Sequence, residues 1–505
     1  MSSNFGSIPL RYRVSIDREQ CMECGRCIDN CSYGVFRRDG DRILINSRKC
    51  TACHRCLAYC PRDAIMLEEH PCDYRSHPVW NRQVREAIYN QARTGKIILA
   101  GMGSVANLPV IFDHLMLDAC QVTTPPTDPL REPVELRTYL GKKPSRLDFR
   151  RNSNGDVELS TELAPNLMVE TPILLGHMSY GAISLNAQVS MARAAKETGT
   201  YMGTGEGGLH PGLYPYQDRM IVQVASGRFG VNIDYLERGA AIEVKLGQGA
   251  KPGIGGHLTG EKVSKDVSRT RMIPQGSDAI SPAPHHDIYG IEDLPQLVRS
   301  IKEATGWKKP VFAKVAAVNN TAENVAAVAR ASVDAIAIDG FRGGTGAAPR
   351  VFRDHVGIPI EVAIASADRE LRKQGLRNEV SLIACGSIRE SADIVKAIAL
   401  GADAVYIGTA ALAAMGCRVC GNCYQGLCPW GIATQRDDLV QRLNPDVASK
   451  QVANLIHAWT MEVTELMGAA GINSIESLRG NRDRLRGFML DEGLLNVLDV
   501  KPVGA

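Results

Sequence analysis

From residue 170 onward, short apolar runs alternate with longer amphipathic segments. The apolar runs predict strands at 172–178, 200–205, 220–225, 241–249, 310–318, 334–340, 381–387 and 404–410. Helical rhythm fills the gaps, as at 184–199, 291–306, 321–332 and 390–402. Eight short buried strands that alternate with helices are typical of a parallel sheet, and eight such strands close a TIM barrel. We therefore expect an α/β TIM barrel with its active site at the carboxyl ends of the strands.

The chain before this pattern is organised differently. Segment 77–95 has a helical rhythm, 96–101 is a short strand candidate, and the proline-rich 123–133 is typical of an extended linker. The expected division is a first domain over 1–70, a connecting region over 71–130, the barrel over 131–480 and a C-terminal tail over 481–505.

Composition excludes several classes of protein. Hydrophobic residues make up 44% and charged residues 22% of the 505, which is ordinary globular usage and argues against disorder. A net charge of +3 and 5% aromatic residues give no sign of nucleic-acid binding. No apolar run approaches the roughly 18 residues of a membrane helix, and no signal peptide is visible. We expect a cytoplasmic protein, so its 15 cysteines indicate metal chemistry rather than disulfides.

Eight cysteines repeat one spacing, C-x2-C-x2-C-x3-C, within 40 residues. In such runs three thiolates bind one iron–sulfur cube and the fourth reaches the other cube. The expected ligands are Cys21, Cys24, Cys27 and Cys60 for one [4Fe–4S] cluster, and Cys50, Cys53, Cys56 and Cys31 for the second. The alternative is a pair of structural zinc sites. Residues 12–70 thus resemble a bacterial two-cluster ferredoxin, an α+β fold, except that Ser32 stands where that family usually has proline.

A third cysteine motif follows the last predicted strand. Cys417, Cys420, Cys423 and Cys428 are spaced C-x2-C-x2-C-x4-C, and Pro429 follows them. One further cluster is expected here, at the active-site end of the barrel, with zinc again the alternative.

Glycines and small polar residues follow three neighbouring strands of the predicted barrel. They are Gly343 and Gly344, Gly386 and Ser387, and Gly408 and Thr409. Any one of them could be a plain turn residue, but together they suit a phosphate, since glycine lets backbone N–H groups approach an anion. Flavin mononucleotide (FMN) is the simplest occupant, because flavin exchanges single electrons with clusters and hydride with substrates. Lys314, inside the barrel, suits the electron-rich edge of a reduced flavin.

The longest predicted loop, 247–289, carries Lys251, His257, Arg271, His285 and His286. Long loops in compact domains are usually functional, and Arg with Lys suits a dicarboxylate. The alternative is a solvated basic loop. Adjacent histidines rarely face one ion, so both are expected to form hydrogen bonds rather than bind metal.

Several strings carry a family resemblance: PILLGHMSYGAIS, TGTGEGGLHP, VQVASGRFGV, KLGQGAKPGIGGHLTGEKV, SPAPHHDIYGIEDL, DGFRGGTGAAP and GLCPWGIATQ. They closely resemble the synthase domain of the glutamate synthase family over about residues 130–480. With the ferredoxin-like head, the whole arrangement is similar to the archaeal-type large subunit of that family. The resemblance implies an FMN barrel that reduces 2-iminoglutarate, formed from 2-oxoglutarate and ammonia, to L-glutamate.

The resemblance also implies roles for single residues. Lys251 and Arg271 match residues that bind 2-oxoglutarate, and Glu206 matches an acidic residue near the substrate and the ammonia entry. Glu206 and Lys314 are the expected catalytic residues. The expected flavin contacts are Met178, Ser179, Gln223, Lys314 and the glycine turns named above. The family's cluster ligands map onto Cys417, Cys423 and Cys428.

Departures from the family pattern leave alternatives open. His257, kept here as a substrate contact, stands where the family usually has Gln, and Cys420 could turn a [3Fe–4S] cluster into a [4Fe–4S] cluster. The chain begins Met1-Ser2-Ser3, without the family's usual glutaminase domain, so we expect free ammonia or a separate glutaminase subunit. The GMGS string at 101–104 does not continue as a dinucleotide fingerprint, so electrons are expected from a partner flavoprotein or a ferredoxin, within an oligomeric complex. The alternatives are an N-methylglutamate synthase component or a non-catalytic electron-transfer subunit.

Overall fold

The predicted barrel is confirmed by a computed structural model, which describes residues 10–70, 82–106 and 108–505. Eight parallel strands close on themselves, because the first strand pairs with the last. In barrel order the strands are β11 (Ile173–Leu175), β12 (Met202–Gly203), β13 (Met220–Val224), β14 (Ala241–Lys245), β17 (Val311–Ala316), β18 (Ala335–Asp339), β20 (Ser381–Cys385) and β21 (Ala404–Ile407). Nearly all their residues are buried, as expected of parallel strands covered by helices.

Helices surround the barrel. In chain order they are α4 (Leu185–Glu197), the 3-10 segment η3 (Pro211–Arg219), α5 (Ile233–Arg238), α7 (Leu294–Ala304), α8 (Thr321–Arg330), α10 (Ile360–Lys373), α11 (Ser391–Ala399) and α14 (Pro445–Ala469). Of these, α4, α7, α8 and α11 lie within the predicted segments. Local chemistry fixes where several begin. Ser184 accepts a hydrogen bond from the Ala187 N–H before α4, and Asn444 caps α14 just ahead of Pro445.

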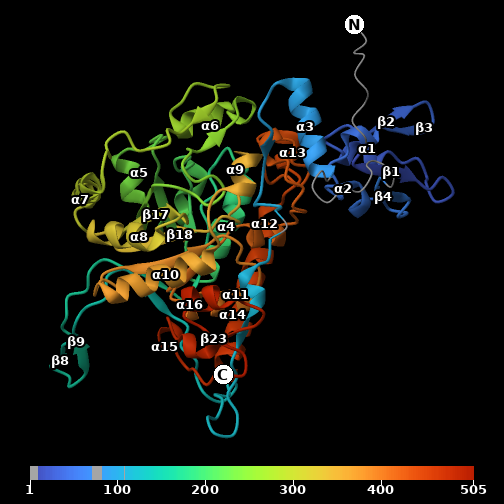
Figure 1. Cartoon of the computed structure of the whole chain (residues 1–505). Coiled ribbons are helices and arrows are strands. Elements are labelled where there is room, and N and C mark those ends of the chain that lie inside the picture. Colours follow the sequence, from blue (N-terminus) through green and yellow to red (C-terminus); the bar gives the residue numbers. More distant parts are fainter. Residues whose placement is uncertain (1–9, 71–81, 107) are drawn as a thin grey trace.

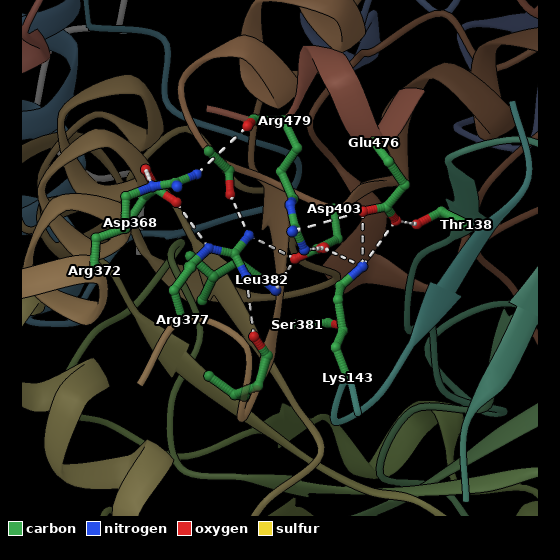
Figure 2. Close-up of polar contacts among 12 residues, drawn as sticks. Thr138, Lys143, Asp368, Arg372, Arg377, Ser381, Leu382, Asp403, Glu476 and Arg479 are labelled. Atoms are coloured by element: carbon green, nitrogen blue, oxygen red, sulfur yellow. Dashed lines mark hydrogen bonds and ion pairs between the residues drawn. The ribbon is translucent and has the colours of Figure 1, made fainter. Parts of the chain in front are cut away.

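A buried network of ion pairs closes the amino end of the barrel (Figure 2). Asp403, just before β21, accepts from Arg377 at 2.7 Å, from Arg479 at 2.9 Å and from the Leu382 N–H at 2.7 Å. Asp368 of α10 binds the same Arg377 at 2.7 Å. Burial alone would raise the pKa of Asp403, but these cations hold that pKa well below its usual range. This end of a TIM barrel serves stability rather than catalysis.

The first domain is a compact α+β unit that packs beside α13 (Asp437–Val440) (Figure 1). Its elements are β1 (Tyr12–Ile16), α1 (Arg26–Asn30), β2 (Phe36–Asp39), β3 (Arg42–Ile45), η1 (Ser47–Lys49), α2 (Arg55–Ala58) and β4 (Ile65–Glu69). Strand β1 pairs antiparallel with β4, and β2 with β3. Val14, Phe36 and Ile43 form its core together with cysteine side chains.

The segment after the first domain contributes to the barrel's carboxyl end. Helix α3 (Arg82–Thr94) lies within the predicted helical segment, whose first residues fall outside the described part of the chain. Strand β5 (Leu99–Ala100) pairs with β19 (Ala348–Pro349), which follows β18. Segment 123–133 contains neither helix nor strand.

Smaller elements complete the fold. They are η2 (Ile111–His114), β6 (Leu115–Leu117), β7 (Thr138–Leu140), β8 (Phe149–Arg151), β9 (Val157–Leu159), β10 (Leu167–Val169), α9 (Arg350–His355), α12 (Thr409–Ala414), η6 (Cys423–Gln425), α15 (Ile475–Leu478), η7 (Arg482–Arg484), β22 (Leu485–Gly487), α16 (Glu492–Leu498) and β23 (Lys501–Pro502). The β8–β9 hairpin projects from the body of the molecule (Figure 1). The last residues are folded too, since β22 pairs with β6 and β23.

The long loop predicted over 247–289 contains several short elements of secondary structure. This segment forms β15 (His257–Leu258), η4 (Gly260–Lys262), α6 (Lys265–Arg271), β16 (Ala279–Ile280) and, just after it, η5 (Ile291–Asp293). Leu258, Val263, Val267 and Ala279 form a small separate core beside Tyr180. The segment is therefore a folded cap that holds its charged residues in place. In the part of the chain that the structure describes, no helix is long and apolar enough to span a bilayer.

Candidate active site and cysteine clusters

Glu206 lies after β12, at the carboxyl end of the barrel, inside a ring of cations. Its Oε2 atom is 3.1 Å from Lys245 Nζ and accepts a hydrogen bond from Ser281 at 3.2 Å. Burial would raise the pKa of Glu206, yet Lys245, Arg271 and Lys251 lower it to about 2. A Cβ at Gly256 would collide with this carboxylate, so a side chain there would displace Glu206. Glu206 is thus an ionised carboxylate held rigidly.

The two cations predicted to bind substrate are brought to the same place. Lys251 Nζ donates to the Ala347 carbonyl at 2.7 Å, and burial lowers the pKa of this lysine to about 8. Arg271, the last residue of α6, donates to the Tyr180 carbonyl at 2.8 Å and to Ser179 Oγ at 3.0 Å. Both side chains are almost fully buried. Buried cations without a full counter-charge favour an anionic ligand.

Lys245 was not predicted as a site residue, although it ends β14 inside the site. Its side chain is 10% exposed, and it pairs in register with Lys314 of the neighbouring strand β17. Three cations, Lys245, Lys251 and Arg271, therefore face one carboxylate. Its position at the end of a predicted strand could have identified it, since a lysine that ends a barrel strand usually faces the active site.

The three histidines of the predicted loop differ in burial and in contacts. His285 is buried, its Nε2 lies 2.7 Å from the Lys245 carbonyl, and burial lowers its pKa. His286 is exposed. His257 follows Gly256, in β15, and its role as a substrate contact stays a prediction.

The three glycine turns converge at the carboxyl ends of β18, β20 and β21. A Cβ at Gly344 would lie 3.3 Å from Thr409 Oγ1, and one at Gly343 would lie 2.5 Å from Asp339 Oδ1. Gly386 is packed against the Gly340 backbone at a φ of 101°. Gly408, in contrast, faces open space and precedes α12. These turns have the bare backbone that a phosphate group needs.

Lys314 lies inside the barrel, 3.3 Å from Asp339 Oδ2. Burial acts to lower its pKa, but Asp339 outweighs that effect and raises it, so the side chain stays charged. Gln223, another predicted flavin contact, donates to Glu243 Oε1 at 2.7 Å. Met178 follows β11 and is half-buried. These residues share the barrel's carboxyl end, and their flavin contacts stay predictions.

The eight cysteines of the first domain line two cavities in the predicted combinations. One cavity is lined by Cys21, Cys24, Cys27 and Cys60, and the other by Cys31, Cys50, Cys53 and Cys56. Among the described residues, no three His, Cys, Asp or Glu side chains converge as they would on a single ion. Thiols arranged around a cavity suit a cube of iron and sulfide better than one tetrahedral zinc.

All three cysteine motifs share one backbone conformation. The second residue after the leading cysteine has a positive φ in each: 50° at Glu23, 51° at Ala52 and 52° at Val419. Two residues further on, φ is again positive in all three, at Gly25, His54 and Gly421. The Glu23 and Val419 N–H groups donate to the leading thiols, Cys21 and Cys417, at 3.4 Å. The third motif is therefore folded like the two ferredoxin-type motifs.

The third motif contacts both the first domain and the barrel. Trp430 Nε1 donates to the Cys53 carbonyl at 3.0 Å, and Ser32 Oγ donates to the Leu427 carbonyl at 2.5 Å. On the barrel side, Cys423 Sγ lies 3.4 Å from Met102 Sδ. The Met102 N–H donates in turn to Thr345 of the glycine turn after β18. Residues 101–103 thus separate the third motif from the predicted phosphate site, a role that sequence reasoning missed.

Comparisons with known proteins agree with this arrangement. The conserved region in glutamate synthase matches residues 106–473, and a 4Fe-4S dicluster domain matches residues 13–61. "Archaeal glutamate synthase [NADPH]" of Methanocaldococcus jannaschii is 64% identical, covering 98% of this chain and 99% of that protein. "Archaeal-type glutamate synthase [NADPH]" of Thermotoga maritima is 53% identical over 98% of both. "Glutamate synthase [NADPH] large chain" of Azospirillum brasilense is 36% identical over 76% of this chain and 24% of that protein.

These matches extend over nearly the whole chain and include both the cysteine-rich domain and the barrel. The chain belongs to the glutamate synthase family of oxidoreductases.

Proposed function

We propose that this enzyme makes L-glutamate from 2-oxoglutarate and ammonia by reductive amination at the Glu206 site. The observation that carries the proposal is the charge at that site. Lys245, Lys251 and Arg271 face the single carboxylate of Glu206, which leaves two positive charges uncompensated. A dicarboxylate such as 2-oxoglutarate carries the matching two negative charges.

Each cation has a separate part in holding the substrate. Arg271 is fixed by Tyr180 and Ser179, so its planar guanidinium is oriented for one carboxylate. Lys251 is tied to Ala347, beside the glycine turn that is proposed to hold the cofactor phosphate. Such fixed groups align the reacting carbon with the cofactor, and alignment supplies much of the rate.

Glu206 and Lys245 are suited to act on the nitrogen of the incoming amine. Ammonia adds to the ketone carbon and water leaves, which gives 2-iminoglutarate. Two electrons and a proton then reduce the C=N bond, and a further proton completes the amino group. Glu206, ionised at neutral pH, can attract ammonium to the ketone and accept a hydrogen bond from the incoming nitrogen, while Lys245 at 3.1 Å can donate a proton to that nitrogen.

The cofactor expected at the three glycine turns is FMN. The turns fit a phosphate because Gly408 faces open space and Gly344 lies against Thr409. Lys314 and Gln223 would lie along the ring system. Bound there, FMN would supply hydride to the imine carbon and accept electrons singly from iron–sulfur clusters.

The cysteines would hold three clusters. The two cavities of the first domain fit [4Fe–4S] cubes, and a 4Fe-4S dicluster domain matches there. For the third we propose a [4Fe–4S] cluster with Cys420 as its fourth ligand, because residues 417–421 repeat the backbone of the ferredoxin-type motifs. The relatives are named for NADPH, whereas the GMGS string of this chain is packed against Arg342 and Cys423. We therefore propose that a partner flavoprotein or ferredoxin delivers electrons to the first domain, and that ammonia is free or comes from a glutaminase subunit.

A binding titration tests the charge argument. Purified oxidised protein is titrated with 2-oxoglutarate and, in parallel, with 2-oxobutyrate, and the flavin absorbance reports binding. We expect the dicarboxylate to bind at least tenfold more tightly. Equal affinity for the two acids would show that the excess charge does not select substrate.

A further inference from the structure

The interior of the barrel holds a buried carboxylate, Glu243, in addition to the Glu206 site. Glu243 is fully buried, and it pairs in register with Gln223 of β13 and with Phe312 of β17. On β14 it stands two residues before Lys245, so it lies deeper in the barrel by about 7 Å, since a strand rises about 3.3 Å per residue. Phe312 likewise stands two residues before Lys314. Glu243 is therefore placed below both Lys245 and Lys314.

Three donors hold the Glu243 carboxylate. Gln223 Nε2 donates to its Oε1 atom at 2.7 Å, and His177 Nε2 lies 3.2 Å from the same oxygen. The Tyr406 hydroxyl donates to Oε2 at 3.4 Å. Burial acts to raise the pKa of Glu243, but these contacts and the charge of Lys314 lower it. Because hydrogen bonds from several donors favour the charged form of a carboxyl group, Glu243 is held as an anion.

His177 is neutral, because its two ring nitrogens have different partners. The Gly205 N–H donates to Nδ1 at 3.1 Å, so Nδ1 carries no hydrogen and the ring hydrogen is on Nε2, which faces Glu243. The ring fits there because Gly203 has no side chain: a Cβ at Gly203 would lie 2.3 Å from the His177 Cγ atom. His177 therefore supplies a hydrogen bond to Glu243 but no charge.

The charge of Glu243 is consequently unmatched. Lys314 has Asp339 as its ion-pair partner at 3.3 Å, so one carboxylate already balances that lysine. Within residues 10–70, 82–106 and 108–505, no lysine or arginine forms an ion pair with Glu243. Towards the carboxyl end of the barrel the sign reverses, because the three cations around Glu206 leave an excess of positive charge. The interior is thus negative below the proposed flavin site and positive at the proposed substrate site.

We propose that the fixed negative charge of Glu243 lowers the reduction potential of the bound flavin and thereby makes the reduced flavin a stronger hydride donor. A buried anion disfavours the electron-rich reduced ring. In the transfer, the imine carbon gains a hydride, two electrons and one proton, from the reduced flavin, which is oxidised. Negative charge then moves away from Glu243 and towards the three cations, and charges fixed in advance along that direction stabilise the transition state. Glu243 acts through the flavin and is a positioning residue; the inference rests on the proposed function.

The test is an anaerobic redox titration of the flavin in the holoenzyme, with FMN quantified in every sample. Glu243→Gln keeps the shape, and the Tyr406 hydroxyl can turn to accept from the new amide, so we expect unchanged flavin content and a flavin midpoint shifted to higher potential. Glu243→Asp keeps the charge and should bring the midpoint back towards the wild-type value. The matched control is Asp403→Asn, which neutralises an equally buried carboxylate at the amino end of the barrel and should leave the flavin midpoint in place.

A second variant keeps the test decisive if Glu243→Gln fails to fold or loses flavin. Tyr406→Phe removes one donor from Glu243 and leaves its charge less shared, so the flavin midpoint should move to lower potential, opposite to the shift in Glu243→Gln. A midpoint that does not rise in flavin-replete Glu243→Gln, or that does not fall in Tyr406→Phe, would overturn the inference. Wild-type protein that binds no flavin would instead overturn the proposed function.

Discussion

Lys245 Nζ lies 3.1 Å from Glu206 Oε2, and this ion pair joins the ends of strands β14 and β12 at the candidate active site. Both side chains are nearly buried, at 10% and 12% exposure. The pair keeps Glu206 ionised while leaving Lys251 and Arg271 available for an anionic substrate.

Removing the Lys245 charge should weaken dicarboxylate binding. In Lys245→Met the excess positive charge falls from two to one, and we expect the Kd of 2-oxoglutarate to rise at least tenfold. That corresponds to about 1.5–3 kcal/mol, the range for a hydrogen bond to a charged group. Lys308→Met, in an exposed turn before β17, is the matched control and should bind normally. An unchanged Kd in Lys245→Met would remove this residue from the substrate site.

Neutralising Glu206 should separate binding from turnover. Glu206→Gln keeps the shape but loses the negative charge that attracts ammonium, so kcat at limiting ammonium should fall by about 10²-fold or more. Binding of 2-oxoglutarate should not weaken, because the site becomes more positive. Stopped-flow turnover and the flavin titration together measure this split. A rise in Kd with kcat intact would contradict the assigned role.

The pH dependence of binding follows from Lys251, whose pKa is lowered by burial to about 8. Below that pH the side chain is protonated and attracts the dianion; as pH rises through about 8 the charge is lost. The Kd of 2-oxoglutarate should therefore rise above pH 8. In Lys251→Arg the cation persists, so this rise should vanish. A wild-type Kd that stays flat from pH 7 to 10 would contradict the prediction.

Cys420 gives a spectroscopic prediction. Cys420→Ala should convert the third cluster from [4Fe–4S], diamagnetic when oxidised, to [3Fe–4S], which is paramagnetic when oxidised. Electron paramagnetic resonance of air-protected oxidised protein detects the change. Cys120→Ala is the control, because Cys120 is buried outside all three motifs. A paramagnetic [3Fe–4S] signal already present in intact wild-type protein would show that Cys420 is not a ligand.

The network at the amino end of the barrel predicts a stability effect without a catalytic one. Asp403→Asn leaves Arg377 and Arg479 without their shared carboxylate, and removing one partner of a buried pair costs about 3–5 kcal/mol. The Tm should fall by several degrees, while the Kd of 2-oxoglutarate at low temperature stays the same. A Tm within a degree of wild type would show that the network is not stabilising.

Local patterns in the sequence predicted the barrel strands and the two cysteine sets of the first domain. All eight barrel strands fell within the predicted runs, because fully buried parallel strands are continuously apolar. The assignment of Cys60 and Cys31 to opposite cysteine sets agrees with the two cavities. The short turns of each motif place three thiols around one cavity and the fourth thiol at the other.

Local sequence patterns could not predict the long-range contacts. Met102 meets Cys423 across more than 300 residues of chain, and no periodicity marks that contact. The short elements of the cap over 247–289 were not predicted, because its helix α6 spans only Lys265–Arg271 and its small core is assembled with Tyr180 from another strand end. Lys245 looked like an ordinary strand residue until the cap brought Ser281 and Gly256 against Glu206.

The central claim is tested most directly by anaerobic turnover of the chain alone. Protein with measured flavin and iron is supplied with reduced viologen, 2-oxoglutarate and ammonium, and the amino-acid product is identified by mass spectrometry. We predict L-glutamate from ammonium at a rate well above that of N-methylglutamate from methylamine. Fully loaded protein that forms no glutamate, or that prefers methylamine, would contradict the account.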